Sequence, residues 1–156
     1  MVDAAVEKSW VVLSAEEMEA LGAHFASAIN TGGVIFLHGP LGAGKTTWTR
    51  GFLHARGHLG AVKSPTYTLV ESYLLLDGAV HHFDLYRLGD PEELEYMGIR
   101  DYFSGDALCL VEWPERGAGI IGAADIALTL RYCDNGRELS AHADSEKGRE
   151  ILLQLT

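Results

Sequence analysis

Hydrophobic and polar positions in the first third of the chain alternate between strand-like and helix-like patterns. From Met18 to Phe25 the apolar residues are spaced by three and four, which is typical of one face of an amphipathic helix. Ser14 followed by Glu17 forms a capping-box signature at the start of that helix. We therefore predict, in order, a strand at Lys8–Leu13, a helix from Ser14 to about Asn30, a strand buried on both faces at Val34–Leu37, and a helix from Lys45 to about Arg56.

The remaining two thirds of the chain contain two hairpin signals. Asp77-Gly78 and Asp134-Asn135-Gly136 each separate two segments that are predicted as strands. Asp90 before Pro91 is typical of a helix start, whereas Gly148 weakens a helix prediction near the end of the chain. The predicted elements are strands at Thr66–Leu76 and Val80–Asp84, a helix at Pro91–Met97, strands at Ala107–Val111, Ile126–Tyr132 and Glu138–His142, and a helix from Ser145 onward.

Length and composition fit an ordinary globular protein. The 156 residues are 47% hydrophobic and 22% charged, and they show no repeat or convincing linker, so we expect one domain over 1–156. The apolar runs are too short to span a bilayer, and the first residues do not resemble a signal peptide, which predicts a cytoplasmic protein with no membrane contact. Cys109 and Cys133 lack metal-ligand spacing and are expected to be reduced thiols.

The net charge changes the expected partners. The chain has a formal charge of −10 with only 12 lysines and arginines and no run of them. Proteins that bind nucleic acid on their own usually present a basic face, because phosphate neutralisation supplies most of the affinity. We therefore do not expect the protein to bind RNA or DNA on its own. An acidic surface suits a protein partner with a basic face.

One motif carries specific chemistry. Residues 39–46 read Gly-Pro-Leu-Gly-Ala-Gly-Lys-Thr, which matches the P-loop pattern between a predicted buried strand and a predicted helix. Glycines let the backbone curl around a polyphosphate, and the amides that face inward form an anion-binding nest at a helix N-terminus. Lys45 supplies a full positive charge to the phosphates, and the Thr46 hydroxyl is a ligand for Mg²⁺. The motif predicts ATP-Mg²⁺ binding. Together with strands mixed with helices and two hairpins, it predicts an α/β fold, a P-loop NTPase-like three-layer sandwich with a mixed parallel and antiparallel sheet.

A P-loop protein also needs an acid from a second strand to hold Mg²⁺. Asp84 and Glu112 each end a predicted strand, and the strand before Glu112 is more uniformly apolar, as a central strand would be. The sequence leaves open which of the two carboxylates contacts the metal directly. The sequence lacks the Asn-Lys-x-Asp motif, which reads guanine, and the Asp-x-x-Gly motif, which senses the γ-phosphate. Their absence from the sequence disfavours a GTPase.

Three further features of the sequence allow less specific interpretations. His81 and His82 are adjacent, so on a strand they face opposite sides, and we expect one packed and one exposed. Trp113 fits either the core or an aromatic lid, and from the residues alone we favour the core. The polar segment Ser64–Thr68 fits either an ordinary loop or a switch that reaches the γ-phosphate.

Six segments of the chain match one known family in the same order: Gly42–Thr47, Lys63–Leu69, His82–Arg87, Pro91–Leu94, Gly98–Phe103 and Val111–Pro114. Through them the chain resembles the bacterial TsaE (YjeE) family over roughly residues 10–140. The family usually has Asp or Asn where this chain has Pro40, which leaves the phosphate-binding positions intact.

The resemblance implies a small ATPase that is needed to make threonylcarbamoyladenosine in tRNA. It implies work with the TsaD–TsaB heterodimer, with tRNA met only indirectly through that complex. It also implies Thr46, Asp84 and Glu112 as metal-site residues, Ser64–Thr68 as a switch and Trp113 as a functionally sensitive residue. The implied nucleotide contacts are Gly39, Leu41, Gly42, Ala43, Gly44, Lys45, Thr46 and Thr47, with looser matches at Ser14 and Arg137 for the adenine.

The leading hypothesis is thus an ATPase in which Lys45, Asp84 and Glu112 carry the catalysis, slow alone and stimulated by a partner. Two rivals stay open. A small-molecule kinase would need an acceptor pocket and an arginine-bearing lid, for which Glu92–Arg100 is the available segment. A nucleotide-gated scaffold would bind ATP without turnover.

Overall fold

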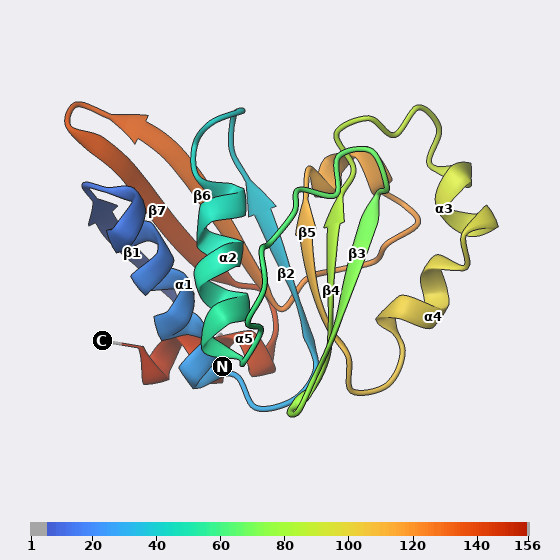
Figure 1. Ribbon diagram of the computed structural model, residues 1–156, viewed down its shortest axis with the longest axis horizontal. Helices are drawn as coiled ribbons and strands as arrows, with labels where there is room; N and C mark the ends of the chain where they lie inside the picture. The colour runs from blue at the N-terminus through green and yellow to red at the C-terminus, as the bar shows by residue number, and fades with distance from the viewer. Residues whose placement is uncertain (1–5, 156) are drawn as a thin grey trace, which may run out of the picture.

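A seven-stranded β-sheet organises residues 6–155, the part of the chain that the computed structural model describes (Figure 1). Its strands are β1 (Glu7–Val12), β2 (Gly33–His38), β3 (Val70–Leu75), β4 (Gly78–Asp84), β5 (Leu108–Glu112), β6 (Ile126–Cys133) and β7 (Gly136–Ala143). They lie in the order β1-β7-β6-β2-β5-β4-β3. Pairing is parallel from β6 through β2 and β5 to β4, and antiparallel at β3, β7 and β1. The predicted mixed sheet is confirmed.

Helices cover both faces of this sheet. They are α1 (Ala15–Ala28), α2 (Lys45–Ala55), α3 (Glu92–Tyr96), α4 (Ile99–Phe103) and α5 (Glu146–Gln154), with a short 3₁₀ helix, η1 (Pro114–Gly117). Helices α1, α2 and α5 pack with alternate residues of the sheet in one hydrophobic cluster. The other cluster lies on the opposite face of the sheet and includes residues of α3 and α4 and residues on either side of η1. The prediction of three layers is therefore confirmed.

The parallel strands decide where a site can form. All five residues of β5 are buried, as predicted for a central strand, and β5 lies between β2 and β4. Because β2, β4 and β5 run in the same direction, their carboxyl ends meet at one edge of the sheet. Ligands of open α/β sheets bind in the crevice outside such an edge.

Helices α1 and α2 approach so closely that two glycines are needed between them. A Cβ on Gly22 would lie 2.1 Å from the carbonyl oxygen of Trp48, and one on Gly51 would lie 1.9 Å from that of Glu19. The Trp48 ring, fully buried, contacts Phe25 and Phe52 with centroids 5.5 and 5.4 Å away. This packing fixes α2, whose first residue is Lys45, against the rest of the core.

Most predicted elements form within a few residues of their expected ends, and the differences have local causes. Residues 66–69 form a turn, with the Leu69 amide donating to the Pro65 carbonyl at 2.8 Å and Leu69 at φ 69°, so β3 begins at Val70 and not at Thr66. Helix α4 was not predicted. Asp90 accepts a hydrogen bond from the Glu92 amide at 2.9 Å, in agreement with its predicted place at the start of a helix.

Gly148 does not interrupt the last helix, because the fold requires a glycine there. A Cβ at this position would lie 1.9 Å from the carbonyl oxygen of Asp125, so α5 packs directly on the backbone of the segment before β6. Ser145 accepts from the Gly148 amide and donates to the Asp125 carboxylate at 2.6 Å. The predicted helix from Ser145 onward is confirmed.

The two cysteines lie in different environments as free thiols. Cys109 is buried in β5, where burial raises the pKa of its thiol to about 12, and it donates to the Tyr102 carbonyl at 3.2 Å. Cys133 is exposed at the end of β6. Within residues 6–155, none of the helices has the length and apolar character needed to cross a membrane.

The close approach of α1 and α2 makes a testable prediction. Gly22→Ala forces a methyl group against the Trp48 carbonyl, and overpacking of this kind costs about 1–3 kcal/mol of unfolding free energy. Chemical denaturation should show a lower midpoint for this variant with an unchanged slope.

The matched control is Gly89→Ala, since the nearest atom to a Cβ there is the flexible Glu93 carboxylate oxygen, 3.5 Å away. We expect its stability to stay within about 0.5 kcal/mol of the wild type. Equal midpoints for the two variants would contradict the close packing of α1 on α2.

Candidate functional site

The loop of residues 39–46 connects the carboxyl end of β2 to the amino end of α2. Gly39, Gly42 and Gly44 have φ values of 152°, 79° and 113°, which residues with a Cβ atom rarely adopt. At Gly44 a Cβ would also lie 2.9 Å from the Met18 methyl group. The glycines thus give the loop its curled path, and it ends at the N-terminus of an eleven-residue helix with no acidic residue in its first turn. The helix dipole and free amides favour an anion at this position.

Lys45 is a buried cation at the centre of this loop. Its side chain is only 5% exposed, its Nζ donates to the Gly39 carbonyl, and the same atom lies 4.1 Å from the centroid of the Trp113 ring. Burial lowers the pKa of Lys45, while the nearby carboxylates of Glu112 and Asp84 act in the opposite direction. The ammonium group is therefore largely out of water, where its attraction for an anion is strong.

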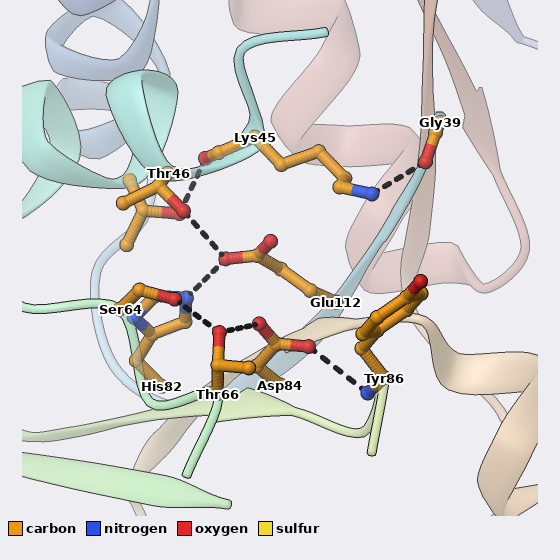
Figure 2. Close-up of polar contacts among 10 residues, drawn as sticks. Gly39, Lys45, Thr46, Ser64, Thr66, His82, Asp84, Tyr86 and Glu112 are labelled. Carbon is orange, nitrogen blue, oxygen red and sulfur yellow. Dashed lines mark hydrogen bonds and ion pairs between the residues drawn. The ribbon is translucent and has the colours of Figure 1, made fainter. Parts of the chain in front are cut away.

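The two candidate acids lie side by side. Asp84 pairs with Glu112 in the register of β4 and β5, and the side chains are 5% and 3% exposed. Thr46 donates from its hydroxyl to Glu112 Oε2 at 3.2 Å (Figure 2). The sheet therefore brings together the three residues predicted for the metal: Thr46, Asp84 and Glu112.

Asp84 is held by the segment that the sequence left as either a loop or a switch. Its Oδ2 accepts from the Thr66 hydroxyl at 2.9 Å, and its Oδ1 accepts from the Tyr86 amide at 3.0 Å (Figure 2). Ser64 lies 2.7 Å from the same Thr66 hydroxyl. The segment Ser64–Thr68 thus reaches the acidic side of the site through Thr66, as a switch would need to.

His82 belongs to the site, which the sequence did not predict. It is fully buried, and its Nε2 lies 2.6 Å from Glu112 Oε2 (Figure 2). His81 faces the other side of β4, as predicted, but it is half-buried against Tyr102 and not exposed. The alternation of β4 was the available signal, because it puts His82 and Asp84 on one face.

Trp113 packs against the second hydrophobic cluster, in keeping with the predicted core position, and its ring also reaches the site. It is half-buried, and its ring contacts both Lys45 and Tyr86, with the centroids of the two aromatic rings 5.0 Å apart. Its backbone has φ 56°, a conformation that is uncommon for a residue with a side chain. Outliers of this kind concentrate at functional sites, where surrounding structure holds them in place.

Two adjoining hollows open on either side of the loop. One, of about 250 Å³, is mainly apolar, and the other, of about 220 Å³, contains the acids and Lys45. Gly42, Gly44 and Thr47 line both, so Thr47 lies where the hollows meet. The apolar hollow is lined by Val12, Leu13, Ser14, Ala15, Met18, Gly42, Ala43, Gly44, Thr47, Gly136 and Arg137.

The outer predicted residues, Ser14 and Arg137, are therefore close to the loop. Ser14 accepts from the Glu17 amide at 3.1 Å and caps α1, which confirms the capping prediction and places its side chain at the hollow's wall. Arg137 donates to the Gly42 carbonyl at 3.4 Å and stacks on Tyr132 at 4.5 Å. Tyr132 was not predicted; its hydroxyl donates to the Leu41 carbonyl and so touches the loop from β6.

The donors at the acidic end suit a hard cation. Residues 6–155 contain no group of three or more His, Cys, Asp and Glu side chains arranged to hold a metal ion. Thr46, Asp84 and Glu112 offer oxygen atoms on one side of the loop, which fits Mg²⁺ shared with the phosphates of a nucleotide. The Thr46 hydroxyl gives its hydrogen to Glu112 and keeps its oxygen lone pairs for an ion.

A family model described as threonylcarbamoyl adenosine biosynthesis protein TsaE matches residues 12–139. The chain belongs to the TsaE family. It is 55% identical over 119 residues to the tRNA threonylcarbamoyladenosine biosynthesis protein TsaE of Haemophilus influenzae, which covers 76% of this chain and 75% of that protein. The protein of the same name from Bacillus subtilis is 42% identical over 106 residues, 67% of this chain and 65% of that protein.

The likeness to the TsaE family extends to the fold. The crystal structure of Bacillus subtilis YdiB superposes with a TM-score of 0.82 at 27% identity, covering 98% of this chain and 96% of that one. The segment matched by the TsaE model includes all the predicted site residues, from Ser14 to Arg137. The resemblance inferred from the motifs is confirmed, whereas the roles of the individual residues remain predictions.

Proposed function

We propose that this protein binds ATP with Mg²⁺ at residues 39–46 and hydrolyses it as a component of the machinery that makes threonylcarbamoyladenosine in tRNA. One observation carries the proposal: the buried ammonium of Lys45 lies at the carboxyl edge of the sheet opposite the paired carboxylates of Asp84 and Glu112. A cation and two acids in one hollow beside a glycine loop suit a triphosphate with its metal.

The phosphates would occupy the polar hollow. The curled loop and the N-terminus of α2 supply amides, and Lys45 would exchange the Gly39 carbonyl for phosphate oxygens. Trp113 lies over Lys45 and limits the access of water to it. An anion in this position would compensate the burial of the Lys45 cation more fully than the nearby carboxylates of Glu112, Asp84 and Glu115 do, since burial still lowers its pKa.

The base would enter the apolar hollow on the other side of the loop. Leu13 and Met18 offer apolar contact to a purine ring, and the Arg137 guanidinium is available to stack on it or to meet the ribose. Ser14 and Thr47 add hydroxyl groups at the wall. The hollow adjoins the phosphate side through Gly42, Gly44 and Thr47, which matches the order of groups in ATP.

Mg²⁺ would be held by the Thr46 hydroxyl and by Asp84 and Glu112, either directly or through bound water. When bound, the ion neutralises charge that develops on the phosphate oxygens during transfer. The chain itself keeps the two carboxylates fixed: Thr66 and the Tyr86 amide hold Asp84, and Thr46 and His82 hold Glu112.

Hydrolysis would be slow without a partner. No arginine is among the described residues that line the polar hollow, so an arginine contributed by another protein would complete the charge stabilisation. We propose that the TsaD–TsaB heterodimer is that partner and that ATP turnover resets it between modification cycles. The net charge of −10 favours such a role over direct binding of tRNA. The protein would contact tRNA only indirectly, through the complex.

The kinase alternative finds no support in the position of its predicted lid. Glu92–Arg100 forms α3 and part of α4, and these helices pack Leu94 and Ile99 into the cluster on the opposite face of the sheet. The scaffold alternative shares the same binding site and differs only in turnover, which the following experiment decides.

We expect Lys45→Ala and Glu112→Ala to reduce the ATPase rate by about a hundredfold or more, because each removes a charge that acts on the phosphates or their metal. The rate should be measured with and without the TsaD–TsaB heterodimer, and the wild type should be faster with it. Lys147→Ala is the matched control, since Lys147 is exposed and bonded to the Thr31 carbonyl on α5's side of the protein.

Wild-type rates from either site variant would contradict the site assignment. Bound but intact ATP in a single-turnover assay of the wild type with its partner would instead favour the scaffold.

The biological role has a separate test. Deleting the gene should remove threonylcarbamoyladenosine from bulk tRNA, as measured by nucleoside analysis. The wild-type gene and the Lys147→Ala gene should restore it, and Lys45→Ala should not. An unchanged level of the nucleoside after deletion would refute the role in tRNA modification. It would not contradict the proposed ATP site.

A further inference from the structure

His82 is the most deeply buried polar side chain beside the candidate metal site. It is 0% exposed, and its Nε2 lies 2.6 Å from Glu112 Oε2, while Glu112 itself is 3% exposed. Within the described residues, its other ring nitrogen, Nδ1, has no hydrogen-bond partner. A histidine that only filled space here would leave two polar atoms to be satisfied, at a cost an apolar side chain avoids. The hydrogen bond to Glu112 satisfies one of these polar atoms, which an apolar side chain could not do.

The sheet register explains why the two residues meet. His82 pairs with Leu110, and Asp84 pairs with Glu112, so His82 lies two residues before the acidic pair on the same face of the sheet. The Glu112 side chain crosses from β5 toward β4 and ends at the imidazole (Figure 2). This arrangement joins the two strands that present the candidate metal ligands.

The hydrogen bonds on Glu112 are unequal between its two oxygens. An ionised carboxylate only accepts, so the hydrogen of the short contact belongs to His82 Nε2. The Thr46 hydroxyl donates to the same atom, Oε2, at 3.2 Å. Two donors on Oε2 fix the rotation of the carboxylate and leave Oε1 as the oxygen available to an ion or to its bound water. Groups that orient metal ligands in this way tune metal affinity strongly.

We propose that His82 is a positioning residue for the Mg²⁺ of the bound nucleotide, acting through Glu112. The inference rests on the proposed function, since it requires that Mg²⁺-nucleotide binds at Lys45 and Thr46. It does not require His82 to touch the nucleotide or the ion. Its consequence is that His82 affects the part of nucleotide affinity that depends on magnesium and leaves the part supplied by Lys45 and the loop amides.

The test uses a pair of amide variants. The side-chain nitrogen of glutamine reaches the position of Nε2, whereas that of asparagine reaches only the position of Nδ1 and falls short of Glu112. Isothermal titration calorimetry with ADP, first in EDTA and then at increasing Mg²⁺, separates the two parts of the affinity. We expect His82→Asn to lose about 10- to 100-fold of the gain that Mg²⁺ gives, and His82→Gln to retain most of that gain. In EDTA both should bind ADP as the wild type does.

The control is His81→Asn on the other face of β4, where His81 contacts Ser72 and Tyr102. It should keep the wild-type magnesium dependence. Melting curves of all variants without nucleotide show whether they are folded.

Each other outcome overturns the proposal. A folded His82→Asn protein with the wild-type magnesium dependence would show that Glu112 needs no such support. Equal losses in EDTA and in Mg²⁺ would show a merely structural role, and so would an unfolded His82→Gln protein. Absence of ADP binding by the wild type would instead refute the proposed function itself.

Discussion

The burial of the Lys45 ammonium opposite two carboxylates is the interaction on which the site depends. A lysine removed from water is unfavourable unless opposite charge or strong acceptors surround it. Here the Gly39 carbonyl, the Trp113 ring, Asp84 and Glu112 provide that surrounding, and burial still lowers the pKa of the lysine. The fold keeps α2 in place through the glycine contacts with α1, so Lys45 cannot move far from the acids. The result is a fixed positive charge prepared for a polyanion.

The acids are fixed by contacts that join separate parts of the chain. Thr46 comes from the loop, His82 from β4 and Thr66 from the turn before β3, and each forms a hydrogen bond to one of the two carboxylates. A change at the metal would therefore be felt by the Ser64–Thr68 segment through Thr66 and Asp84. Such a connection offers a physical route from the state of a nucleotide to the surface that a partner would meet, because Tyr67 in that segment is 82% exposed.

Patterns within short segments predicted the fold well, and contacts between distant segments were predicted poorly. The hairpins, the P-loop and the acids at the ends of β4 and β5 have local signals, and all formed as expected. Trp113 does pack against the second hydrophobic cluster, but an aromatic residue after a buried strand does not reveal that its backbone will adopt φ 56° and place the ring beside Lys45. The roles of His82 and Tyr132 depend on strand register and on loop position, which no single segment contains. The helix propensity of glycine argues against a helix at Gly148, but the close contact with the Asp125 backbone, which requires a glycine, lies outside the local sequence pattern.

Calorimetric titration of the wild-type protein with ATP and Mg²⁺ tests the central claim most directly. The account predicts saturable heat with one nucleotide per chain, tighter binding with Mg²⁺ than with EDTA, and a higher melting temperature of the complex. Millimolar ATP and Mg²⁺ that give neither heat nor a shift in melting would contradict it.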